Sequence, residues 1–307
     1  MKSQRNNKLM MIFIDGVGIG KNDIHINPFV RFKLKFWNDF FGEIPTLRNS
    51  RIQNKYFSIF PVNATMGVEG VPQSGTGQTA IFCGFNASKF LGKHFGPYPY
   101  STLKPKIKEE NIFIELNSFN FNSYFSNAYP QKYFDYFKNV NRTMGVIALS
   151  YTSAGYKLNT SIDVLEKRAI TAEITNEIWN SKLGYDLPEY SPQKAGEIFY
   201  NISQNYHFNL FEYFLTDYAG HSQDFSFAQT VLDKLDGFLE GIINKMNFNK
   251  ETLFIISDHG NLEDLSTKSH TRNPALGIAI GKYHQEFSNK IKFLYQVKKN
   301  IINYLEA

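Results

Sequence analysis

Cysteine is nearly absent from this sequence, since Cys83 is the single example in 307 residues. A disulfide framework and a thiolate metal site are therefore excluded. Two neighbours of Cys83, Ile81 and Phe82, are apolar, which indicates a buried and unreactive thiol. Any metal ion in this protein must be held by oxygen and nitrogen ligands.

Long apolar runs and concentrated charge are also lacking. The apolar run Leu9–Ile14 has six residues, which is too short for a membrane span or the core of a signal peptide. The 33 basic and 28 acidic residues give a net charge of +5, but they form no basic stripe of the kind that binds nucleic acid. We therefore expect a cytoplasmic protein with a small anionic substrate, and neither nucleic acid nor a membrane as partner.

The apolar residues that are present are arranged in patterns of strands and helices. Apolar runs predict buried strands at Leu9–Ile14, 143–150, Phe208–Thr216, Leu253–Ile256 and Leu276–Ile280. A periodic apolar stripe predicts a helix over Phe225–Met246, and we also expect helices over 171–182, 191–205 and 283–305. Residues 21–70 contain three prolines and predict no regular element. Alternating strands and helices of this kind indicate an α/β fold.

Acidic residues and histidines gather where these strands end. Asp15, Asp217 and Asp258 each follow a predicted strand, and the nearby loops contain His221, His259 and His270, three of the seven histidines. Because ligands of open α/β sheets bind at the carboxyl ends of the strands, we expect the six side chains to converge. Carboxylates and imidazoles suit Zn²⁺ and Mn²⁺ equally, so the set predicts two divalent metal ions. The plainer reading of Asp15 alone is a carboxylate that caps a turn.

Ser74 lies at a predicted helix start, followed by small residues, then by an apolar stretch, and then by Gly84. A serine in this place is most often an N-cap. The same position puts the hydroxyl at the positive end of the helix dipole, beside free backbone amides that can bind phosphate oxygens. Paired metal ions support phosphoryl transfer, and a hydroxyl next to them can act as a nucleophile.

These motifs resemble those of the alkaline phosphatase superfamily of binuclear metalloenzymes. The resemblance is nearest to the branch that contains cofactor-independent phosphoglycerate mutase and phosphopentomutase. The matching elements are IFIDGVGIG around Asp15, Ser74 ten residues before Gly84, Asp217–His221 (DYAGH), Asp258–Glu263 (DHGNLE) and His270–Pro274 (HTRNP). The resemblance implies a three-layer core with a mostly parallel central sheet flanked by helices. It further implies a core of residues 1–100 and 205–307, with a small cap region inserted at 101–204.

The same resemblance implies how the ligands are shared. One metal ion would be held by Asp15, Ser74, Asp258 and His259, and the other by Asp217, His221 and His270. Ser74 would be the nucleophile, with Thr76 as a rival whose spacing to Gly84 is two residues shorter. Lys89 and Lys93 follow the nucleophile helix and are weak candidates for substrate binding, for which a solvated helix face is the plainer reading.

The implied activity is that of a metal-dependent phosphohydrolase that forms a phosphoserine at Ser74. A phosphomutase is the first alternative, but the insertion is short and contains Arg142 and Arg168 as the only arginines between Ser74 and Asp217. A phosphodiesterase is a second alternative. A sulfatase is disfavoured because the proline and arginine of the sulfatase pattern do not follow Ser74. A non-catalytic relative is disfavoured because every ligand position is filled.

Overall fold

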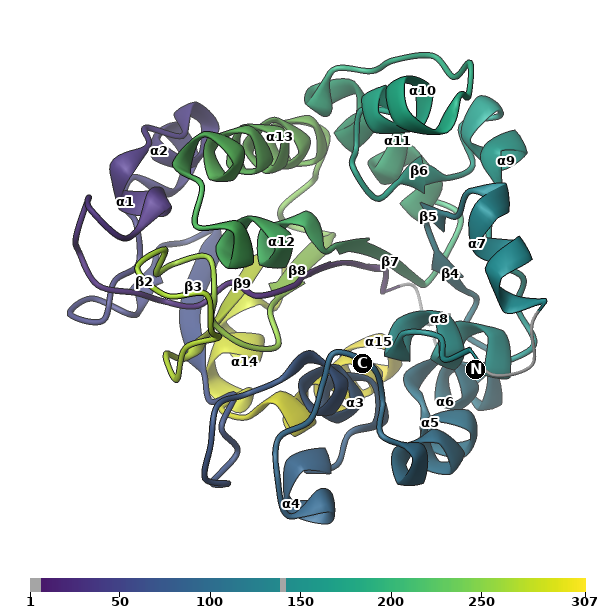
Figure 1. Ribbon diagram of the computed structural model, residues 1–307, viewed down its shortest axis with the longest axis horizontal. Helices are drawn as coiled ribbons and strands as arrows, with labels where there is room; N and C mark the ends of the chain where they lie inside the picture. Colours follow the sequence, from purple (N-terminus) through teal and green to yellow (C-terminus); the bar gives the residue numbers. More distant parts are fainter. Residues whose placement is uncertain (1–6, 139–141) are drawn as a thin grey trace.

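The computed structural model describes residues 7–138 and 142–307, and its centre is a mixed seven-stranded sheet (Figure 1). The strands lie in the order β2-β3-β9-β8-β1-β7-β4. Strands β8, β1, β7 and β4 are parallel, whereas β9 is antiparallel to both β8 and β3, and β2 is antiparallel to β3. The bounds are β1 Leu9–Ile14, β2 Ile52–Gln53, β3 Phe57–Val62, β4 Ser123–Phe125, β7 Phe208–Tyr213, β8 Thr252–Ile256 and β9 Ala275–Gly281.

Strand β1 shows why its sequence is apolar throughout. All six residues are buried, and successive side chains point to opposite faces of the sheet. Leu9, Met11 and Phe13 belong to one hydrophobic core, while Met10, Ile12 and Ile14 belong to the other. A strand in the middle of a sheet covered on both faces needs apolar residues at every position.

Helices cover both faces of the sheet and complete three layers (Figure 1). One face carries α1 Pro28–Arg31, α2 Lys35–Phe41, α11 Pro192–Ser203, α12 Leu215–Ser222 and α13 Phe225–Ile243. The other carries α3 Ser74–Cys83, α5 Lys104–Glu110, α6 Ile112–Ser118, α8 Val146–Ser153, α14 His284–Lys290 and α15 Val297–Glu306. The short helix α4, Ala87–Leu91, follows α3. The predicted three-layer α/β architecture is thus confirmed.

Helix α13 has a side-chain cap at its start and the apolar stripe that its sequence predicted. Asp224 caps its start by accepting hydrogen bonds from the backbone N–H groups of Ser226 and Phe227, at 2.8 and 3.3 Å. Such a cap is worth ~1 kcal/mol. Its apolar stripe packs against α11, where Gly196 and Gly241 allow the two helices to approach closely.

The predicted insertion, residues 101–204, lies partly in the core and partly in a small cluster beside the sheet. Strand β4 from this segment is the edge strand of the central sheet, and α5, α6, α8 and α11 pack on the core. The remainder forms a small cluster beside the sheet, with β5 Asn127–Ala128 paired to β6 Ile170–Thr171 and with α7 Gln131–Phe137, α9 Ser161–Leu165 and α10 Glu177–Leu183. The boundary of a separate cap therefore stays a prediction, whereas part of the segment belongs to the core.

Four predicted elements were wrong in type or extent. Residues 143–150 were expected as a strand but contribute to helix α8, because an apolar run this short has no periodicity that separates the two. The expected 283–305 helix is two helices, and the backbone of Ile291 is extended between them. The expected 171–182 helix begins only at Glu177. Strand β7 ends at Tyr213, so residues 215–222 form helix α12 instead of continuing it.

Residues 21–70 also contain more structure than their prolines suggested. Strand β3 lies here and includes Pro61. Pro61 is tolerated because β2 pairs only with Ser58 and Ile59, so no described strand needs an N–H from Pro61 on that side, while β9 pairs with the strand along its whole length. Within the described residues, no helix is both long enough and apolar enough to cross a membrane.

Candidate metal centre

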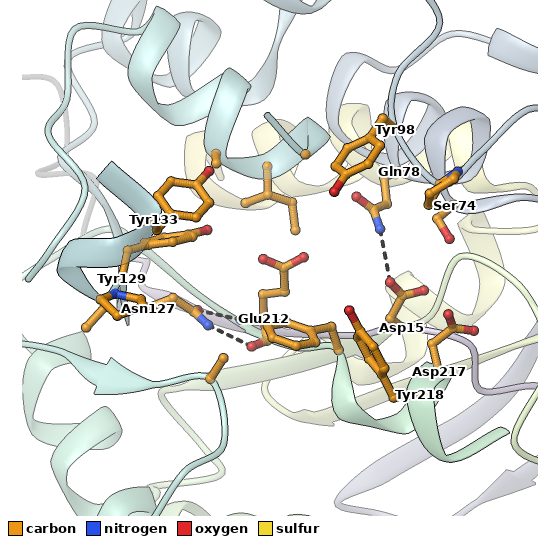
Figure 2. Close-up of a pocket in the computed structure, with 18 of the residues that line it drawn as sticks. Asp15, Ser74, Gln78, Tyr98, Asn127, Tyr129, Tyr133, Glu212, Asp217 and Tyr218 are labelled. Atoms are coloured by element: carbon orange, nitrogen blue, oxygen red, sulfur yellow. Dashed lines mark hydrogen bonds between the residues drawn. The ribbon is translucent and has the colours of Figure 1, made fainter. Parts of the chain in front are cut away.

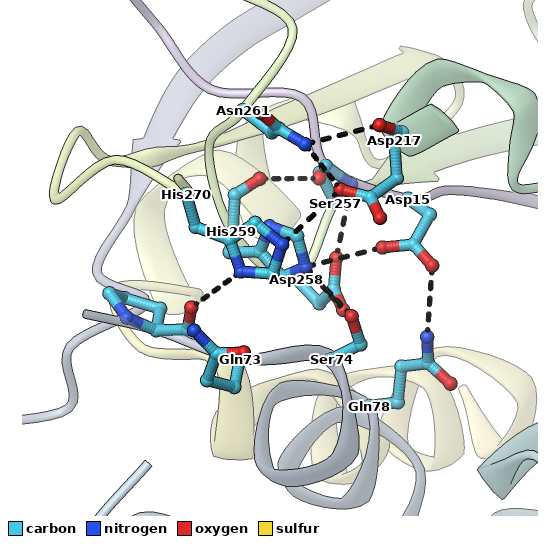
Figure 3. Close-up of polar contacts among 12 residues, drawn as sticks. Asp15, Gln73, Ser74, Gln78, Asp217, Ser257, Asp258, His259, Asn261 and His270 are labelled. Carbon is cyan, nitrogen blue, oxygen red and sulfur yellow. Dashed lines mark hydrogen bonds and ion pairs between the residues drawn. The ribbon is translucent and has the colours of Figure 1, made fainter. Parts of the chain in front are cut away.

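The topology brings the three predicted aspartates to one edge of the sheet. Strands β7, β1 and β8 are parallel neighbours whose carboxyl ends are level, with Ile14 opposite Tyr213 and Phe13 opposite Ile256. Asp15 follows β1 directly, and Asp258 follows β8 after Ser257. Asp217 reaches the same place from the first turn of α12. Figure 3 shows the three carboxylates around the start of α3.

Each of the three histidines is oriented by a backbone carbonyl. Nδ1 of His221 lies 2.7 Å from the carbonyl oxygen of Lys268, and Nδ1 of His270 lies 2.9 Å from that of Pro72. Nδ1 of His259 lies 3.3 Å from the carbonyl oxygen of Gly260. A carbonyl can only accept, so Nδ1 carries the proton and Nε2 is left with its lone pair. This is the arrangement that prepares a histidine to bind a metal ion through Nε2.

The three Nε2 atoms point into the same small volume. Nε2 of His270 lies 3.1 Å from Nε2 of His221, and the ring of His270 stacks on that of His259 with a centroid distance of 3.8 Å. Nε2 of His221 is 3.2 Å from Oδ2 of Asp217, and Nε2 of His270 is 3.5 Å from Oδ1 of Asp217. Donor atoms that face one another at these separations must share either protons or metal ions between them.

The carboxylates add to this requirement because two of their oxygens are buried without a hydrogen-bond donor in the described part of the chain. Oδ1 of Asp15 and Oδ2 of Asp258 are buried and have no hydrogen-bond partner among the described residues. They face Nε2 of His259 at 3.3 and 3.5 Å. A buried carboxylate oxygen without a donor costs several kcal/mol, roughly, unless a cation compensates it.

The pKa values of the site residues reflect the same excess of negative charge. Burial lowers the pKa of His259, but the carboxylates of Asp258, Asp15 and Asp217 outweigh it and raise that pKa to about 10. Burial, followed by the charge of Asp15, raises the pKa of Asp258 well above its usual value. Hydrogen bonds with His221 and His270 overcome burial and hold the pKa of Asp217 far below its usual range. The site therefore favours positive charge at its centre.

The donor atoms fit two divalent ions, and their grouping differs in part from the expected one. Asp217, His221 and His270 place one donor atom each within 4.8 Å of one another, as expected for one ion. The second group of this kind is Asp15, Asp217 and His259. Asp217 thus belongs to both groups, while the assignment of Asp258 and Ser74 to the second ion stays a prediction.

Ser74 contributes its hydroxyl to this centre, and Thr76 does not. Oγ of Ser74 lies 3.0 Å from Nε2 of His259. Oγ1 of Thr76 instead donates to the carbonyl of Gln73 at 3.1 Å and accepts from the N–H of Phe95 at 3.2 Å. Ser74 is also the first residue of α3, after Gln73 as the N-cap. The geometry therefore favours Ser74 over Thr76 as the reacting hydroxyl.

Three residues that support the ligands had no role assigned from the sequence. Nε2 of Gln78 donates to Asp15 at 3.3 Å from the first turns of α3, and Nδ2 of Asn261 donates to Asp217 at 2.7 Å. Glu263 is fully buried and accepts from the N–H groups of Gly18 and Asn261, both at 2.8 Å. Glu263 and Asn261 lie in the DHGNLE segment. The match of that segment to the family motif could have identified Asn261 and Glu263, whereas no motif near Gln78 indicated a role for that residue.

A cavity of about 670 Å³ opens from the metal centre (Figure 2). At one end it is lined by Asp15, Ser74, Asp217 and His221. The rest of its wall is mainly aromatic and aliphatic, and it includes Glu212 from β7. The cavity is large enough for a small phosphate ester whose phosphoryl group reaches Ser74.

The two candidate lysines lie away from this cavity. Neither Lys89 nor Lys93 is among its lining residues, and both are exposed. Nζ of Lys93 lies over the rings of Phe95 and Tyr100, at 5.9 and 5.3 Å from their centroids. The structure places neither side chain where it meets a phosphate at Ser74.

Comparison with known proteins agrees with this geometry. The family model of the Metalloenzyme superfamily matches residues 159–307, which include five of the six predicted aspartate and histidine ligands. The chain is 22% identical over 268 residues to the 2,3-bisphosphoglycerate-independent phosphoglycerate mutase of Legionella pneumophila (strain Lens). That match covers 78% of this chain and 50% of the mutase, so the chain spans about half the length of its curated relative.

Solved structures show the same fold. A protein from Pyrococcus horikoshii superposes with a TM-score of 0.57 at 12% identity, covering 98% of this chain and 97% of that one. The alkaline phosphatase of the Antarctic bacterium TAB5 superposes with a TM-score of 0.52 at 12% identity, covering 97% and 98%.

Proposed function

The chain resembles the alkaline phosphatase superfamily of metalloenzymes in both fold and motifs, and from this premise we propose that it is a metal-dependent phosphohydrolase. Its substrate is a small phosphate ester, and its nucleophile is Ser74. The observation that carries the proposal is the 3.0 Å contact between Oγ of Ser74 and Nε2 of His259, inside a cluster of carboxylates and imidazoles.

The reaction has two steps at Ser74. Oγ of Ser74 attacks phosphorus, an Oγ–P bond forms, and the ester P–O bond breaks as the alcohol leaves and takes up a proton. Water then breaks the Oγ–P bond and releases inorganic phosphate, which restores the serine. The backbone N–H groups of Ser74 and Gly75, at the start of α3, make no hydrogen bond to other described residues. They can therefore donate to the phosphoryl oxygens during both steps.

Two divalent ions fit the donor set. We propose that Asp217, His221 and His270 hold one, and that Asp15, Asp258, His259 and Ser74 hold the other. When bound, the ions supply positive charge to the phosphoryl group and lower the pKa of the Ser74 hydroxyl. The structural groups support Zn²⁺ and Mn²⁺ equally, since all ligands are oxygen and nitrogen.

A phosphomutase remains the second candidate because the curated relative is named as one. The cavity argues for hydrolysis instead. No lysine or arginine is among the described residues that line it, so it offers no partner for the carboxylate of a phosphoglycerate. A mutase must also hold the dephosphorylated intermediate until the phosphoryl group returns, which demands strong contacts to both ends of the substrate.

The reaction class is tested by following the phosphoryl group. The protein is loaded with Zn²⁺ or Mn²⁺, mixed with a radiolabelled phosphomonoester and quenched in acid. We expect label on the tryptic peptide that contains Ser74, followed by free phosphate, and no label in the Ser74→Ala variant. Label that returns to an alcohol without free phosphate would identify a mutase. Label on Thr76 would exclude Ser74 as the nucleophile.

A further inference from the structure

The wall of the cavity beyond Ser74 is aromatic but contains one acidic side chain. Six of its described lining residues are aromatic: Tyr98, Tyr129, Tyr133, Trp179, Phe214 and Tyr218. Glu212 is the acidic residue at this end, and Asn127 is its polar neighbour. No lysine or arginine is among the described lining residues, and the one histidine, His221, lies at the metal end. A substrate part that carries negative charge would thus find no described lysine or arginine at this end to pair with.

The position of Glu212 is fixed by its backbone, not by its carboxylate. The N–H of Glu212 donates to Oδ1 of Asn127 at 2.7 Å, and Nδ2 of Asn127 donates to the carbonyl of Glu212 at 2.8 Å. The carboxylate itself accepts no hydrogen bond and pairs with no cation among the described residues. Figure 2 shows it pointing into the cavity, with Tyr129 and Tyr133 on one side and Tyr98 on the other.

The carboxylate of Glu212 affects the pKa of the tyrosines beside it. Burial, and then the charge of Glu212, raises the pKa of Tyr133 and also that of Tyr129. Burial, and then the charge of Asp15, raises the pKa of Glu212 to about 8. Among the described residues, Glu212 thus lacks a positive charge that would stabilise its ionised form, and a cation placed beside it would favour the carboxylate.

We propose that the aromatic end of the cavity binds a cationic leaving group, so that the substrate is a phosphate ester of an amino alcohol, of the choline or ethanolamine type. The inference rests on the proposed function for its phosphoryl end. Aromatic faces attract a quaternary or primary ammonium group through their quadrupoles, and an adjacent carboxylate completes the charge balance. The ester then lies with its phosphoryl group at Ser74 and its ammonium group beside Glu212.

The test compares a cation with a neutral group of the same shape. The probes are choline phosphate and its carbon isostere, in which a tert-butyl group replaces the trimethylammonium group. Binding of each to metal-loaded Ser74→Ala protein is measured by titration calorimetry, so that binding is read without turnover. We expect choline phosphate to bind roughly thirtyfold more tightly, which corresponds to the ~2 kcal/mol of a desolvated cation–π contact.

Substitutions assign the preference to Glu212. In a Ser74→Ala background, Glu212→Gln is expected to reduce the ratio of the two affinities to near unity. Tyr98→Leu, at an aromatic position that is 52% exposed, is expected to reduce it severalfold without a risk to folding. The matched control is Glu286→Gln on the exposed side of α14, which leaves the ratio unchanged.

The outcomes separate this inference from the proposed function. Equal binding of the two probes, or tighter binding of phosphoglycerate or ribose phosphate, would overturn the cationic leaving group. If phosphate release from esters still required Ser74, the phosphohydrolase would stand without it. A Glu212-dependent preference for choline phosphate in a protein that releases no phosphate would support the binding site and overturn the hydrolase. Aminoethyl phosphate and glycerophosphocholine, added as further probes, distinguish the ammonium type and a diester.

Discussion

At the residue scale, the centre depends on side chains that are held in place before any ion arrives. Backbone carbonyls orient the rings of His221, His259 and His270 through Nδ1. Asn261 and Gln78 fix the carboxylates of Asp217 and Asp15. Ligands held by such outer contacts bind their metal more tightly, and loss of one contact typically costs ~10–100-fold in affinity.

Glu263 connects the loops around the metal centre through four hydrogen bonds to its carboxylate. Its two carboxylate oxygens accept from the N–H groups of Gly18 and Asn261 and from the side chains of Thr271 and Asn273. Glu263→Gln replaces one acceptor by a donor that faces other donors. We expect the free energy of unfolding to fall by ~2–4 kcal/mol and metal affinity to fall about tenfold or more. Urea unfolding and metal titration measure both.

The control for Glu263→Gln is the same substitution at the exposed residue Glu286, which is expected to change neither quantity. An equally small effect at Glu263 would show that its four hydrogen bonds do not hold the metal-binding loops together.

The sequence identified those site residues that follow a buried strand. Asp15 and Asp258 could be predicted because an apolar run ends just before each of them. Asp217 was predicted at a strand end but lies in a helix, and it reaches the site because α12 begins two residues after β7 ends. Gln78 and Glu212 could not be predicted, since each gains its role from residues that are distant in the sequence.

At the element scale, the start of α3 determines where Ser74 lies. A Cβ atom on Gly75 would lie 2.3 Å from the carbonyl oxygen of Tyr98 and 2.7 Å from that of Phe95. A Cβ on Gly77 would lie 3.0 Å from the carbonyl oxygen of Asp258. Two glycines in the first turn thus let the backbone on both sides approach the helix, which brings the nucleophile to the ligands.

Gly75→Ala tests this close approach. The added methyl group must displace backbone, so we expect the free energy of unfolding to fall by ~1–3 kcal/mol. We also expect phosphate release to fall more than stability alone explains, because Ser74 moves with the helix start. Gly145→Ala is the control for stability alone, because a Cβ there meets no atom within 4 Å but Gly145 lines the substrate cavity. Its expected cost is ~1 kcal/mol or less. Equal losses in the two variants would contradict the tight contact.

The elements that were predicted correctly are those with a strong and extended pattern. Strands β1, β8 and β9 are buried throughout and their sequences are almost entirely apolar, and the apolar period of α13 is sustained over nineteen residues. Helix α8 was misread because its apolar residues cover more than one face: it packs against α3, α5 and α6. A segment that is buried on several sides loses the periodicity that distinguishes a helix from a strand.

At the scale of the whole molecule, the metal centre joins segments from the first and the last third of the chain. Asp15, Ser74, Asp217, Asp258 and His270 come from separate elements and meet at one edge of the sheet (Figure 3). The unfolded chain cannot present these ligands together, so ions bind the folded state in preference. Bound ions must then stabilise the fold.

Chelation is therefore expected to lower the melting temperature. Free metal at about a thousandfold above its Kd stabilises by ~4 kcal/mol, which corresponds to roughly 10 °C for a chain of this size. Scanning fluorimetry with and without a chelator measures the difference, and added Zn²⁺ or Mn²⁺ is expected to restore it. His221→Ala and His270→Ala are expected to abolish most of the shift. A melting temperature that is unaffected by chelator and by both ions would contradict the metal centre.

The most direct test of the account is phosphate release by the native protein and by Ser74→Ala at equal metal content. A panel of phosphomonoesters and one diester is offered with Zn²⁺ and with Mn²⁺, and bound metal is measured in both proteins. We predict turnover of at least one ester by the native protein, and a decrease of roughly a thousandfold or more in the variant, because loss of the nucleophile removes the covalent route. Undiminished release by a Ser74→Ala protein that carries the same metal would contradict the assignment of Ser74 as the nucleophile.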